Sequence, residues 1–467
     1  MSHESSFHVI KDPVHGTMQF TNIENNWIKP FIDSPTLQRL RHIKQLGMQD
    51  SVFPGAVHTR FNHSIGCCYV ASQITKKIKL KENERQLVMI ACLLHDIGHG
   101  PFSHTFEDIF HDKAIRHETW TPHFLKEYKT KEFFEKYNQI NKNFPLDKEK
   151  FQLIEDVIMH KANNNKLFED IVSSQLDADR LDYLLRDNHF CGVTYGEFDF
   201  RWMLNSMAVV NTPNGKRLGL THKGIGVVEQ YLMARRLMIR NIYFNQKKLA
   251  LEFYLIKLLT IVSENIEQPA FKEIKNGRLG EFLKNTHKLN LKLRQGNCSA
   301  KLKEDFFKEN YENYKDLSDY DIFNLIKFTA NMKDNNHAKL IANRIQQRQM
   351  PKIIRLENFN IVLAEEMLQE FKKANKDHIA NWQINIIKNP NRSYNIEKDP
   401  ILIINEDKVV QPLDTISFMI SALGNKLEHT IFLSIDKEIH NNAEVLAFVK
   451  RLVKENHAKK ETTSALV

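Results

Sequence analysis

Residues 84–104 read ERQLVMIACLLHDIGHGPFSH, an apolar run followed by polar residues, glycines and a proline. The run is apolar on nearly every side, which predicts a buried central helix over Glu84–Ile97. The glycines and the proline then end the helix and open a loop. His95 and Asp96 stand at the end of this helix, where an ionisable pair is costly to bury unless it is paired or binds a metal ion. The segment therefore predicts both the centre of the fold and a site at its edge.

Apolar residues at helical spacing continue on both sides of this segment. Between the later helices, two short β-type runs flank Asn211–Gly215, which predicts a hairpin with its turn at Asn214 and Gly215. We expect the other helices of this region over Pro35–Leu46, Ser64–Ile78, Phe151–His160, Glu169–Asp187 and Gly226–Thr260.

The composition changes after about residue 265, first to Lys- and Asn-rich stretches and then to short apolar runs. We expect strands over Trp382–Ile387, Ile401–Ile404, Ile416–Ile420 and Ile431–Ile435, and a last helix over Asn442–Lys454. The predicted fold class is mainly α, a helical bundle with a small β-hairpin and a C-terminal α+β subdomain. We expect a catalytic unit at residues 1–265, a helical connecting region at 266–380 and the α+β subdomain at 381–467.

The composition is that of a globular protein, with 42% hydrophobic and 26% charged residues in 467. No run approaches the ~20 apolar residues of a membrane helix, and no secretory signal is visible at the N-terminus. Five scattered cysteines without a CxxC pattern indicate a reduced chain, so we expect a cytoplasmic protein without disulfides. The net charge of +9 favours phosphate-bearing partners, either nucleotides or nucleic acid, but a basic surface alone also accounts for it.

Histidines and carboxylates recur on both sides of the first segment. His63 opens the preceding helix, and downstream the run QLDADRLDYLLRD at residues 175–187 places Asp179, Tyr183 and Asp187 on one helical stripe. In the same run Asp182 and Arg186 lie four residues apart, and we expect them to form a surface ion pair. Two imidazoles and two carboxylates suit a divalent cation such as Mn, Fe, Zn, Co or Ni, with Mg also open.

The order His, His-Asp, Asp resembles the HD superfamily of metal-dependent phosphohydrolases. Five motifs are similar to those of deoxynucleoside triphosphate triphosphohydrolases, above all the sterile-alpha-motif and HD-domain enzymes of animals. They are DPVHG at 12–16, QRLRHIKQLG at 38–47, FPGA at 53–56, HTRFNHS at 58–64 and HDIGHGPFSH at 95–104. The resemblance is strong over residues 7–260. Because the chain begins almost at this region, we expect no sterile-alpha-motif domain.

The resemblance implies a role for each residue that matches these motifs. The implied metal ligands are His63, His95, Asp96 and Asp179. The implied catalytic residues are His117 as general acid or base, Glu107 as its partner, and His99 and His104 beside the phosphates. The implied substrate contacts are Arg60, Arg180 and Arg235 on the triphosphate, Gln45 and Asp187 on the sugar 3′-hydroxyl, Tyr183 on the ribose and Tyr243 at the 2′ position. Asp33, Gln38 and Arg41 match a regulatory guanine-nucleotide pocket, although helix capping and salt bridges account for them equally well.

The reaction implied by the resemblance is metal-dependent hydrolysis of deoxynucleoside triphosphates to deoxynucleoside and tripolyphosphate. Activation by a guanine nucleotide and assembly into a dimer or tetramer follow from the same resemblance. Two alternatives stay open. Ile239, Asn245 and Gln246 depart from the animal enzymes, so the same site could act on another nucleotide or a nucleic-acid end. The positive charge also allows a nucleic-acid-binding nucleotide sensor. No membrane partner is expected.

Overall fold

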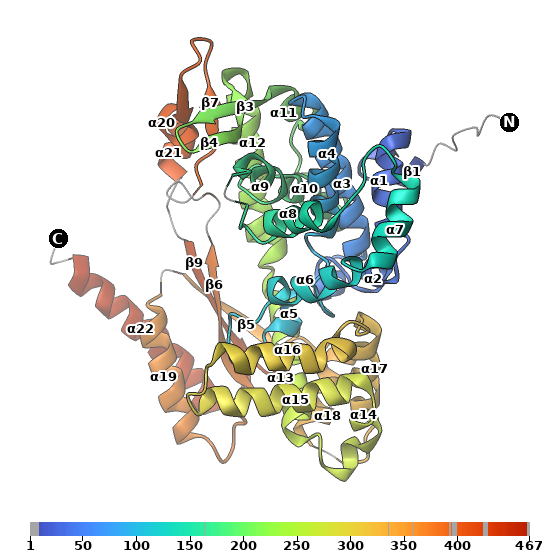
Figure 1. Cartoon of the computed structure of the whole chain (residues 1–467). Helices are drawn as coiled ribbons and strands as arrows, with labels where there is room; N and C mark the ends of the chain where they lie inside the picture. Colours follow the sequence, from blue (N-terminus) through green and yellow to red (C-terminus); the bar gives the residue numbers. More distant parts are fainter. Residues whose placement is uncertain are drawn as a thin grey trace.

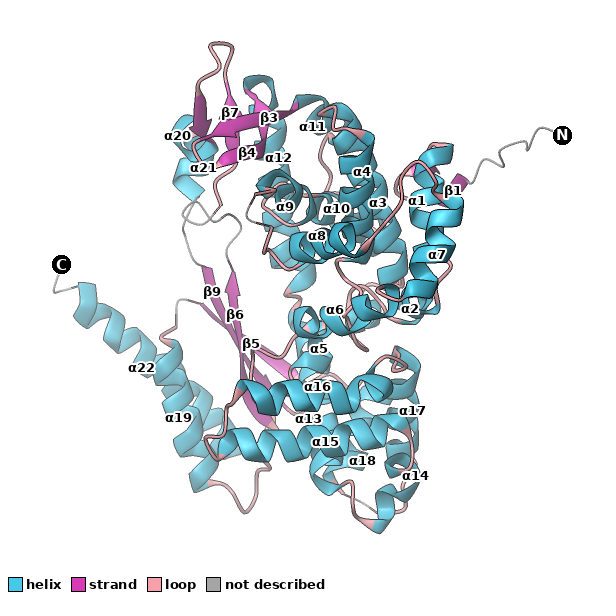
Figure 2. Cartoon of the chain, in the orientation of Figure 1, coloured by secondary structure: helices cyan, strands magenta, loops and turns pink. Residues whose placement is uncertain are grey.

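The computed structural model describes residues 9–162, 164–334, 336–357, 359–391, 394, 399–423 and 428–464. An upper group of helices holds the first half of the chain, a lower group holds α14–α18, and an α+β unit lies beside the lower group (Figure 1). Helices dominate and the sheets are small (Figure 2), which confirms the mainly α prediction. In the described part of the chain, no helix is long and apolar enough to cross a membrane.

The centre of the upper group is helix α4, Glu82–Leu94. Every side chain of Val88–Leu94 is at most 1% exposed, as the apolar run predicts. Helix α4 packs against α3 (Arg60–Lys77), and α3 in turn packs against α10 (Ala178–Cys191). Helix α4 ends at Leu94 and not at Ile97, so His95 is its C-cap. The site predicted at the helix end therefore begins where regular structure stops.

Two predicted helices are shorter than their apolar spacing indicates. In place of a helix over Pro35–Leu46, α2 covers Pro35–Gln38, a 3₁₀ turn covers Arg39–His42, and the chain becomes extended at Ile43. The Ile43 carbonyl accepts a hydrogen bond from the Arg60 N–H at 2.9 Å, and such a contact outside the helix competes with a further turn. In place of one helix over Glu169–Asp187, α9 (Lys166–Val172) and α10 are separate. The break at residues 173–177 makes Asp177 the N-cap of α10.

The long helix expected over Gly226–Thr260 is also interrupted. Helix α12 (Ile225–Met238) passes into a π-helical turn at Ile239–Tyr243, and α13 (Gln246–Asn265) begins after Asn245. The Asn245 side chain caps α13 by accepting hydrogen bonds from two backbone N–H groups, so a new helix starts there. The π turn shifts the angular position of Tyr243, and π turns occur frequently at functional sites.

The predicted hairpin is present as β3 (Met207–Thr212) and β4 (Gly215–Thr221), with Gly215 at a φ of +105° in the turn. It forms a four-stranded sheet with C-terminal strands, because β7 (Leu402–Ile404) pairs in parallel with β4 and β8 (Val410–Pro412) pairs with β7. A separate hairpin of β1 (Val9–Asp12) and β2 (Gly16–Gln19) lies near the N-terminus.

The C-terminal α+β unit has a three-stranded antiparallel sheet in the order β5-β9-β6. Its strands are β5 (Lys352–Glu357), β6 (Ile384–Asn391) and β9 (Glu428–Ile435), with α19 (Ile361–Ala374) and α22 (Ala443–Ser464) packed on it. The expected strand Ile416–Ile420 is wrong, since α20 (Leu413–Ile416) and α21 (Phe418–Leu423) occupy it. Ile416, in α20, is 37% exposed, whereas Ile420, in α21, is 2% exposed. The two residues therefore lie in different surroundings, although they are only four positions apart.

The remaining helices complete the two helical groups. In the upper group they are α1 (Asn22–Ile32), α5 (His104–Glu107), α6 (His117–Leu125), α7 (Lys131–Ile140), α8 (Lys148–Ile158) and α11 (Phe200–Ser206). In the lower group they are α14 (Lys272–Lys275), α15 (Arg278–Arg294), α16 (Ala300–Tyr314), α17 (Asp319–Ala330) and α18 (His337–Gln346). One continuous apolar core joins the two groups, from Met18 to Ile345 and beyond.

Candidate metal centre and active site

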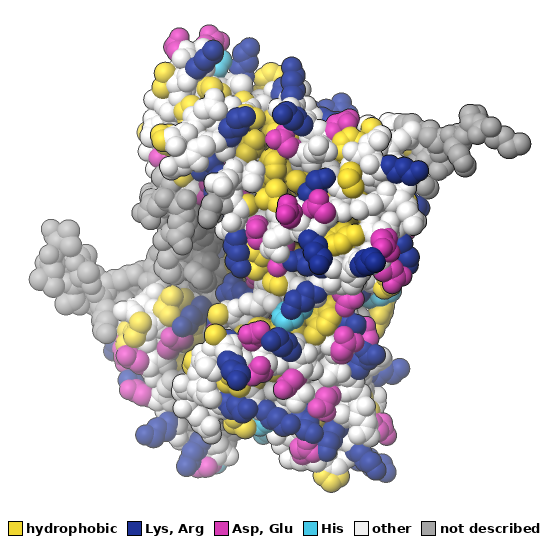
Figure 3. Space-filling view, in the orientation of Figure 1, with side chains coloured by type: hydrophobic (Ala, Val, Ile, Leu, Met, Phe, Trp, Pro, Cys, Tyr) yellow, Lys and Arg dark blue, Asp and Glu magenta, His cyan; other side chains and the backbone are white. Residues whose placement is uncertain are grey.

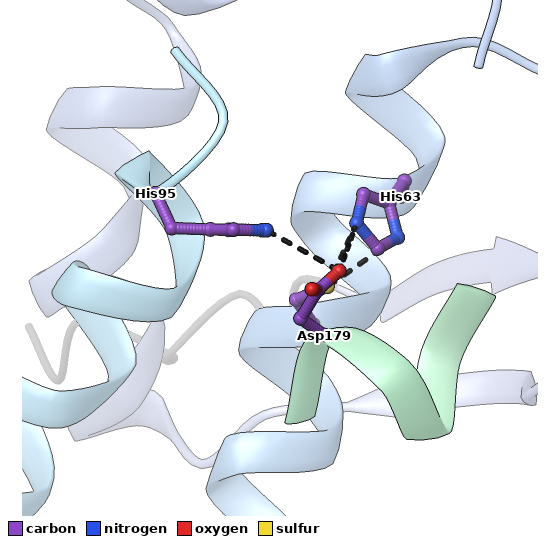
Figure 4. Close-up of side chains that lie close together, drawn as sticks. His63, His95 and Asp179 are labelled. Carbon is purple, nitrogen blue, oxygen red and sulfur yellow. Dashed lines mark hydrogen bonds and ion pairs between the residues drawn. The ribbon is translucent and has the colours of Figure 1, made fainter. Parts of the chain in front are cut away.

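Three side chains from three helices converge on one point (Figure 4). His63 comes from α3, His95 from the end of α4 and Asp179 from the first turn of α10. Oδ1 of Asp179 lies 3.0 Å from Nε2 of His63 and 3.5 Å from Nε2 of His95. Together with Cys67, these residues offer donor atoms that all lie within 4.8 Å of one another. The structure therefore brings three of the four predicted ligands together in a cluster of the right size for an ion, and metal binding by these residues stays a prediction.

The ring nitrogens that face away from this point are held by other groups. Nδ1 of His63 lies 2.8 Å from Oδ2 of Asp182, and Nδ1 of His95 lies 2.8 Å from the Cys92 carbonyl oxygen. Such outer contacts fix the orientation of a ligating imidazole. Nε2 of His95 is buried and makes no hydrogen bond within the described residues. An orphaned, oriented nitrogen of this kind fits a metal ligand.

Cys67 belongs to the group by distance but not by direction. Its Sγ lies 3.4 Å from both ring nitrogens of His63, so the sulfur sits over the ring face and not in line with Nε2. Burial raises the pKa of the Cys67 thiol well above its usual range, and nearby Asp182 and Asp179 raise it further. The sulfur therefore packs on the imidazole, and the nitrogen and oxygen donors are the candidate ligands.

The electrostatics of the cluster demand a positive charge. Burial lowers the pKa of His63, but the hydrogen bonds and charges of Asp179 and Asp182 raise it more strongly, to about 10. Burial raises the pKa of Asp179, and His63 and His95 lower it well below its usual range. The carboxylates are therefore ionised and recruit a proton onto the imidazole. A divalent cation supplies the same charge and frees the nitrogen lone pair for coordination.

Asp96 lies beside the three converging side chains and connects them to the next cluster. Its Oδ1 is 3.5 Å from Nε2 of His95 and 3.4 Å from Nε2 of His99, and its Oδ2 is 3.6 Å from Nε2 of His63. The same Oδ2 forms an ion pair with Arg60. Burial raises the pKa of Asp96, and the surrounding His95, Arg60 and His99 lower it well below its usual range. Asp96 is thus positioned as the predicted fourth ligand, with Arg60 as a competing partner.

A second cluster gathers the four predicted catalytic residues around one carboxylate. Oε1 of Glu107 lies 2.8 Å from Nδ1 of His117, and Oε2 lies 3.3 Å from Nδ1 of His104. The His99 and His117 rings stack with centroids 3.6 Å apart. Burial lowers the pKa of His99 well below its usual range, and the Arg60 and His117 charges lower it further. The cluster therefore holds a neutral His99 next to a His117 that is paired with an anionic Glu107.

The predicted sugar-binding residues begin next to His63, which with His95 and Asp179 forms the cluster called the metal group below. The Tyr183 ring is 6.5 Å from that of His63 and 6.0 Å from that of Tyr243, centroid to centroid. The Tyr243 hydroxyl donates to Oδ2 of Asp187 at 2.8 Å. His58 contacts the other oxygen of this carboxylate at 2.7 Å. These contacts form a continuous polar wall from the metal group to the π-helical turn.

Gln45 and the three predicted phosphate-binding arginines border this wall. The Gln45 N–H donates to the His58 carbonyl at 3.0 Å, and its side-chain oxygen is buried without a hydrogen-bond partner in the described residues. Nε of Arg60 donates to the Ser103 hydroxyl at 2.9 Å. Burial raises the pKa of the neighbouring Tyr183 hydroxyl, and the charges of Arg235 and Arg180 oppose this rise.

The predicted regulatory residues are only partly brought together. Nε of Arg41 donates to the Gln38 side chain at 2.7 Å, and the Arg41 guanidinium lies 3.6 Å from the centre of the Phe61 ring. Asp33 is exposed and forms an ion pair with Lys29 at 3.3 Å. The capping and ion-pair interpretation therefore accounts for the contact of Asp33 but not for the two contacts of Arg41.

The expected surface ion pair of Asp182 and Arg186 is wrong, because both side chains are fully buried. Arg186 donates two hydrogen bonds to Asp182 and also pairs with Asp12 at 2.7 Å. His15, the fourth residue of the DPVHG motif, contacts Asp182 at 2.6 Å. Sequence reasoning missed this network, although the DPVHG motif contains Asp12 and His15 and was its signal.

Residues 60–187 match the model of the HD domain family. The match contains His63, His95, Asp96 and Asp179, so the cluster lies within the part of the chain that is similar to HD domains.

Curated proteins extend the similarity. The chain is 36% identical over 256 residues to the uncharacterized protein YwfO of Bacillus subtilis, covering 54% of this chain and 55% of that protein. It is 27% identical over 413 residues to the deoxynucleoside triphosphate triphosphohydrolase SAMHD1 of Bos taurus, covering 81% of this chain and 62% of that protein. The chain thus spans about three fifths or less of the length of these curated relatives.

A solved structure is similar over nearly the whole chain. A phosphohydrolase from Bacteroides thetaiotaomicron superimposes with a TM-score of 0.69 at 27% identity, covering 92% of this chain and 100% of that one. Together these matches confirm the resemblance to HD-superfamily phosphohydrolases and to the deoxynucleoside triphosphate triphosphohydrolases.

Proposed function

We propose that this chain is a metal-dependent phosphohydrolase that cleaves deoxynucleoside triphosphates into deoxynucleoside and tripolyphosphate. The observation that carries the proposal is the convergence of His63, His95 and Asp179 within 4.8 Å of one another, next to the Glu107 cluster. The similarity to SAMHD1, named as a deoxynucleoside triphosphate triphosphohydrolase, supports the substrate class.

Four residues would hold the divalent cation: His63, His95, Asp96 and Asp179. A cation held there would supply Lewis-acid chemistry and lower the pKa of water in its coordination sphere. The outer contacts of Asp182 and the Cys92 carbonyl keep both imidazoles aimed at the ion. Nitrogen and oxygen donors without a thiolate fit Mn, Fe, Co, Ni or Zn, and Mg less well.

The second cluster supplies proton transfer on the leaving-group side of the reaction. Glu107 holds Nδ1 of His117 at 2.8 Å, which leaves Nε2 of that ring free to exchange a proton with substrate. The stacked His99 stays neutral and can donate a hydrogen bond to a phosphate oxygen. His104 is the solvent-facing member, with 69% of its side chain exposed, and would contact the outer phosphates.

Cations and aromatic rings around the metal group fit the rest of a nucleotide. Arg60, Arg180 and Arg235 would neutralise charge along the triphosphate, for which a planar guanidinium is suited. Tyr183 would pack on the sugar, and Asp187 would accept a hydrogen bond from the 3′-hydroxyl. Tyr243, fixed by its hydrogen bond to Asp187, would fill the space of a 2′-hydroxyl.

The further proposals have separate grounds. We propose a cytoplasmic protein from its cysteine pattern and, from the resemblance, a homo-oligomer activated by a guanine nucleotide at Asp33, Gln38 and Arg41. Of these three residues, Gln38 and Arg41 are in contact. Nucleic acid remains a candidate partner because the net charge is +9. On the visible face, Lys and Arg side chains are interspersed with Asp and Glu (Figure 3), so this view gives no uniform basic surface.

Product identity tests the main proposal. Purified, metal-loaded protein is incubated with each deoxynucleoside triphosphate, with and without GTP, and the products are separated by ion-exchange chromatography. We expect deoxynucleoside and tripolyphosphate, both lost in Asp96→Ala. Orthophosphate or mononucleotides as products would instead indicate a phosphohydrolase for another phosphate ester. Salt-sensitive nucleic-acid binding that survives chelation, without hydrolysis, would favour the sensor.

A further inference from the structure

The loop after His95 and Asp96 has a conformation that its own sequence does not favour. It runs from Ile97 to Ser103 and carries His99. Phe102 and Ser103 have φ values of +52° and +54°, a left-handed region that residues with side chains seldom adopt in succession. Surrounding structure must impose such a conformation, and the contacts that do so are specific.

Three consecutive carbonyl groups of this loop accept hydrogen bonds from two side chains. Nη1 of Arg39 donates to the Ile97 oxygen at 2.9 Å, and Nη2 of Arg39 donates to the His99 oxygen at 2.6 Å. Between them, the Tyr314 hydroxyl donates to the Gly98 oxygen at 3.0 Å. Nε of Arg39 is used as well, since it donates to the carbonyl of Lys315 at 3.0 Å.

The strained end of the loop is held by one carboxylate. Oδ1 of Asp319 accepts the Phe102 N–H at 2.7 Å, and Oδ2 accepts the Lys44 N–H at 2.9 Å. Asp319 is the first residue of α17 and is 3% exposed. The Lys44 carbonyl in turn accepts the Ser103 hydroxyl at 3.1 Å, and this hydroxyl accepts a hydrogen bond from Arg60.

Close packing fixes the loop from the same direction. A methyl group at Gly100 would overlap the hydroxyl end of Tyr314, and one at Gly98 would overlap the His117 carbonyl and Thr121 on α6. The Tyr314 ring stacks on Trp120 with centroids 4.0 Å apart and an interplanar angle of 9°. The loop is therefore wedged between α6, which carries His117, and the end of α16.

We propose that Tyr314 and Asp319, at the corner between α16 and α17, are positioning residues for the active site. They act with Arg39 to hold the loop Ile97–Ser103, and through it they orient His99 and the Ser103 partner of Arg60. The region between residues 266 and 380 thereby belongs to the catalytic machinery. The kinetic consequence rests on the proposed function, whereas the effect on the loop does not.

The test compares two tyrosines that lie one turn apart on α16. Tyr314→Phe removes the hydroxyl bound to the loop and keeps the ring on Trp120. Tyr311→Phe is the matched control, because the Tyr311 hydroxyl donates to Glu127 at 3.1 Å, away from the loop. Asp319→Asn is a second variant. It replaces one of the two carboxylate oxygens, each of which accepts a backbone N–H, by an NH₂ group that can only donate. All are studied as full-length, metal-loaded protein.

Two readouts are measured: hydrogen exchange of the peptide covering Ile97–Ser103, and kcat and KM. For Tyr314→Phe and Asp319→Asn we expect exchange of that peptide to rise about fivefold or more, with other peptides unchanged. We expect kcat to fall about tenfold while KM stays within about twofold. Tyr311→Phe should match the wild type in both readouts.

The outcomes separate this proposal from the proposed function. If the wild type cleaves no deoxynucleoside triphosphate but the loop exchanges faster in both variants, the substrate assignment fails and the positioning role stands. If loop exchange is unchanged in both variants, the positioning role is wrong whatever the activity. A rise in exchange across the whole chain would also overturn it, because it would show a general loss of stability.

Discussion

At the scale of single residues, His63 and His95 reach the same carboxylate oxygen from two helices, and a separate group holds each outer nitrogen. The residue types of this cluster were predictable, because His63, His95, Asp96 and Asp179 follow a recognisable order, and their role as metal ligands stays a prediction. The contact that orients His63 was not predictable, since Asp182 and Arg186 four residues apart have the spacing of an ordinary surface pair. The tertiary approach of helix α3, Asp12 and His15 buries them.

Asp182 should therefore control metal affinity although it is not a ligand. In Asp182→Asn, the ionised partner of His63 is lost and the ring loses its fixed orientation, so we expect metal affinity to fall about 10–100-fold. Metal content is measured by mass spectrometry after equilibration against a graded series of chelator concentrations.

The matched control for Asp182→Asn is Asp170→Asn. Asp170 is also a buried carboxylate paired with an arginine, Arg217 at 2.6 Å, but it is not in contact with the metal group. Asp170→Asn should lower the free energy of unfolding and keep the wild-type metal affinity. Equal metal affinity in both variants would contradict the outer role of Asp182.

Tyr243 offers a test of sugar discrimination. If its ring fills the 2′ position, Tyr243→Ala should admit ribonucleotides and lower the ratio of kcat/KM for dGTP over GTP by about 10–100-fold. Tyr243→Phe keeps the ring and loses only the hydrogen bond to Asp187, so it should retain most of the discrimination. A ratio that falls equally in both variants would assign discrimination to the hydroxyl and not to the ring.

At the scale of elements, apolar periodicity predicted where helices exist better than where they end. Helix α4 lies where it was predicted, because a run that is apolar on all sides is recognisable from the sequence alone, although the helix ends three residues earlier than expected. The helices predicted over Pro35–Leu46 and Gly226–Thr260 were interrupted by contacts that periodicity does not contain, namely the Ile43 carbonyl bond and the Asn245 cap. The division at residues 265 and 380 remains a prediction.

Close approach of α3 and α10 depends on a helical glycine. A methyl group at Gly66 of α3 would overlap the Asp182 carboxylate and the Arg186 guanidinium of α10. Because these side chains are fully buried and paired, they cannot move aside cheaply, and Gly66→Ala should lower the free energy of unfolding by about 1–3 kcal/mol. The measurement is urea denaturation followed by circular dichroism.

Gly226 in α12 is the matched control for Gly66, since a methyl group there meets nothing within 4 Å. Gly226→Ala should raise the free energy of unfolding by about 0.5–1 kcal/mol, because alanine has the higher helix propensity. If Gly66→Ala were as harmless as Gly226→Ala, the two helices would not be as close as the structure shows.

At the scale of the whole molecule, distant parts of the chain complete the upper group of helices. Strand β7 extends the hairpin sheet, and Asp319 reaches from α17 to the loop behind the metal group. Neither contact was visible in the sequence, because each joins segments that are about 180 to 220 residues apart and share no local pattern. The C-terminal strands were partly predicted, but their partners were not.

The Asp319 contact gives the molecule a pH dependence whose sign follows from its burial. Burial raises the pKa of Asp319 to about 6, although the backbone N–H groups of Lys44 and Phe102 oppose the shift. The folded protein therefore keeps a proton that the unfolded chain loses near pH 4. The contribution of this group to the free energy of unfolding is complete below about pH 4 and is lost as the pH rises through about 6.

Asp319→Asn removes the carboxyl group, so this position no longer titrates. The free energy of unfolding of the wild type minus that of the variant therefore reports the pH dependence of this one carboxyl group. We expect this difference to fall as the pH rises from 4 to 6, by at most about 3 kcal/mol, and then to stay constant up to pH 8. Urea denaturation at each pH measures it. Tyr314→Phe loosens the same loop without a group that titrates in this range, so its difference from the wild type should not vary with pH. A difference for Asp319→Asn that is flat from pH 4 to 8, or that grows with pH, would mean that this carboxylate is ionised throughout and binds the loop as an anion.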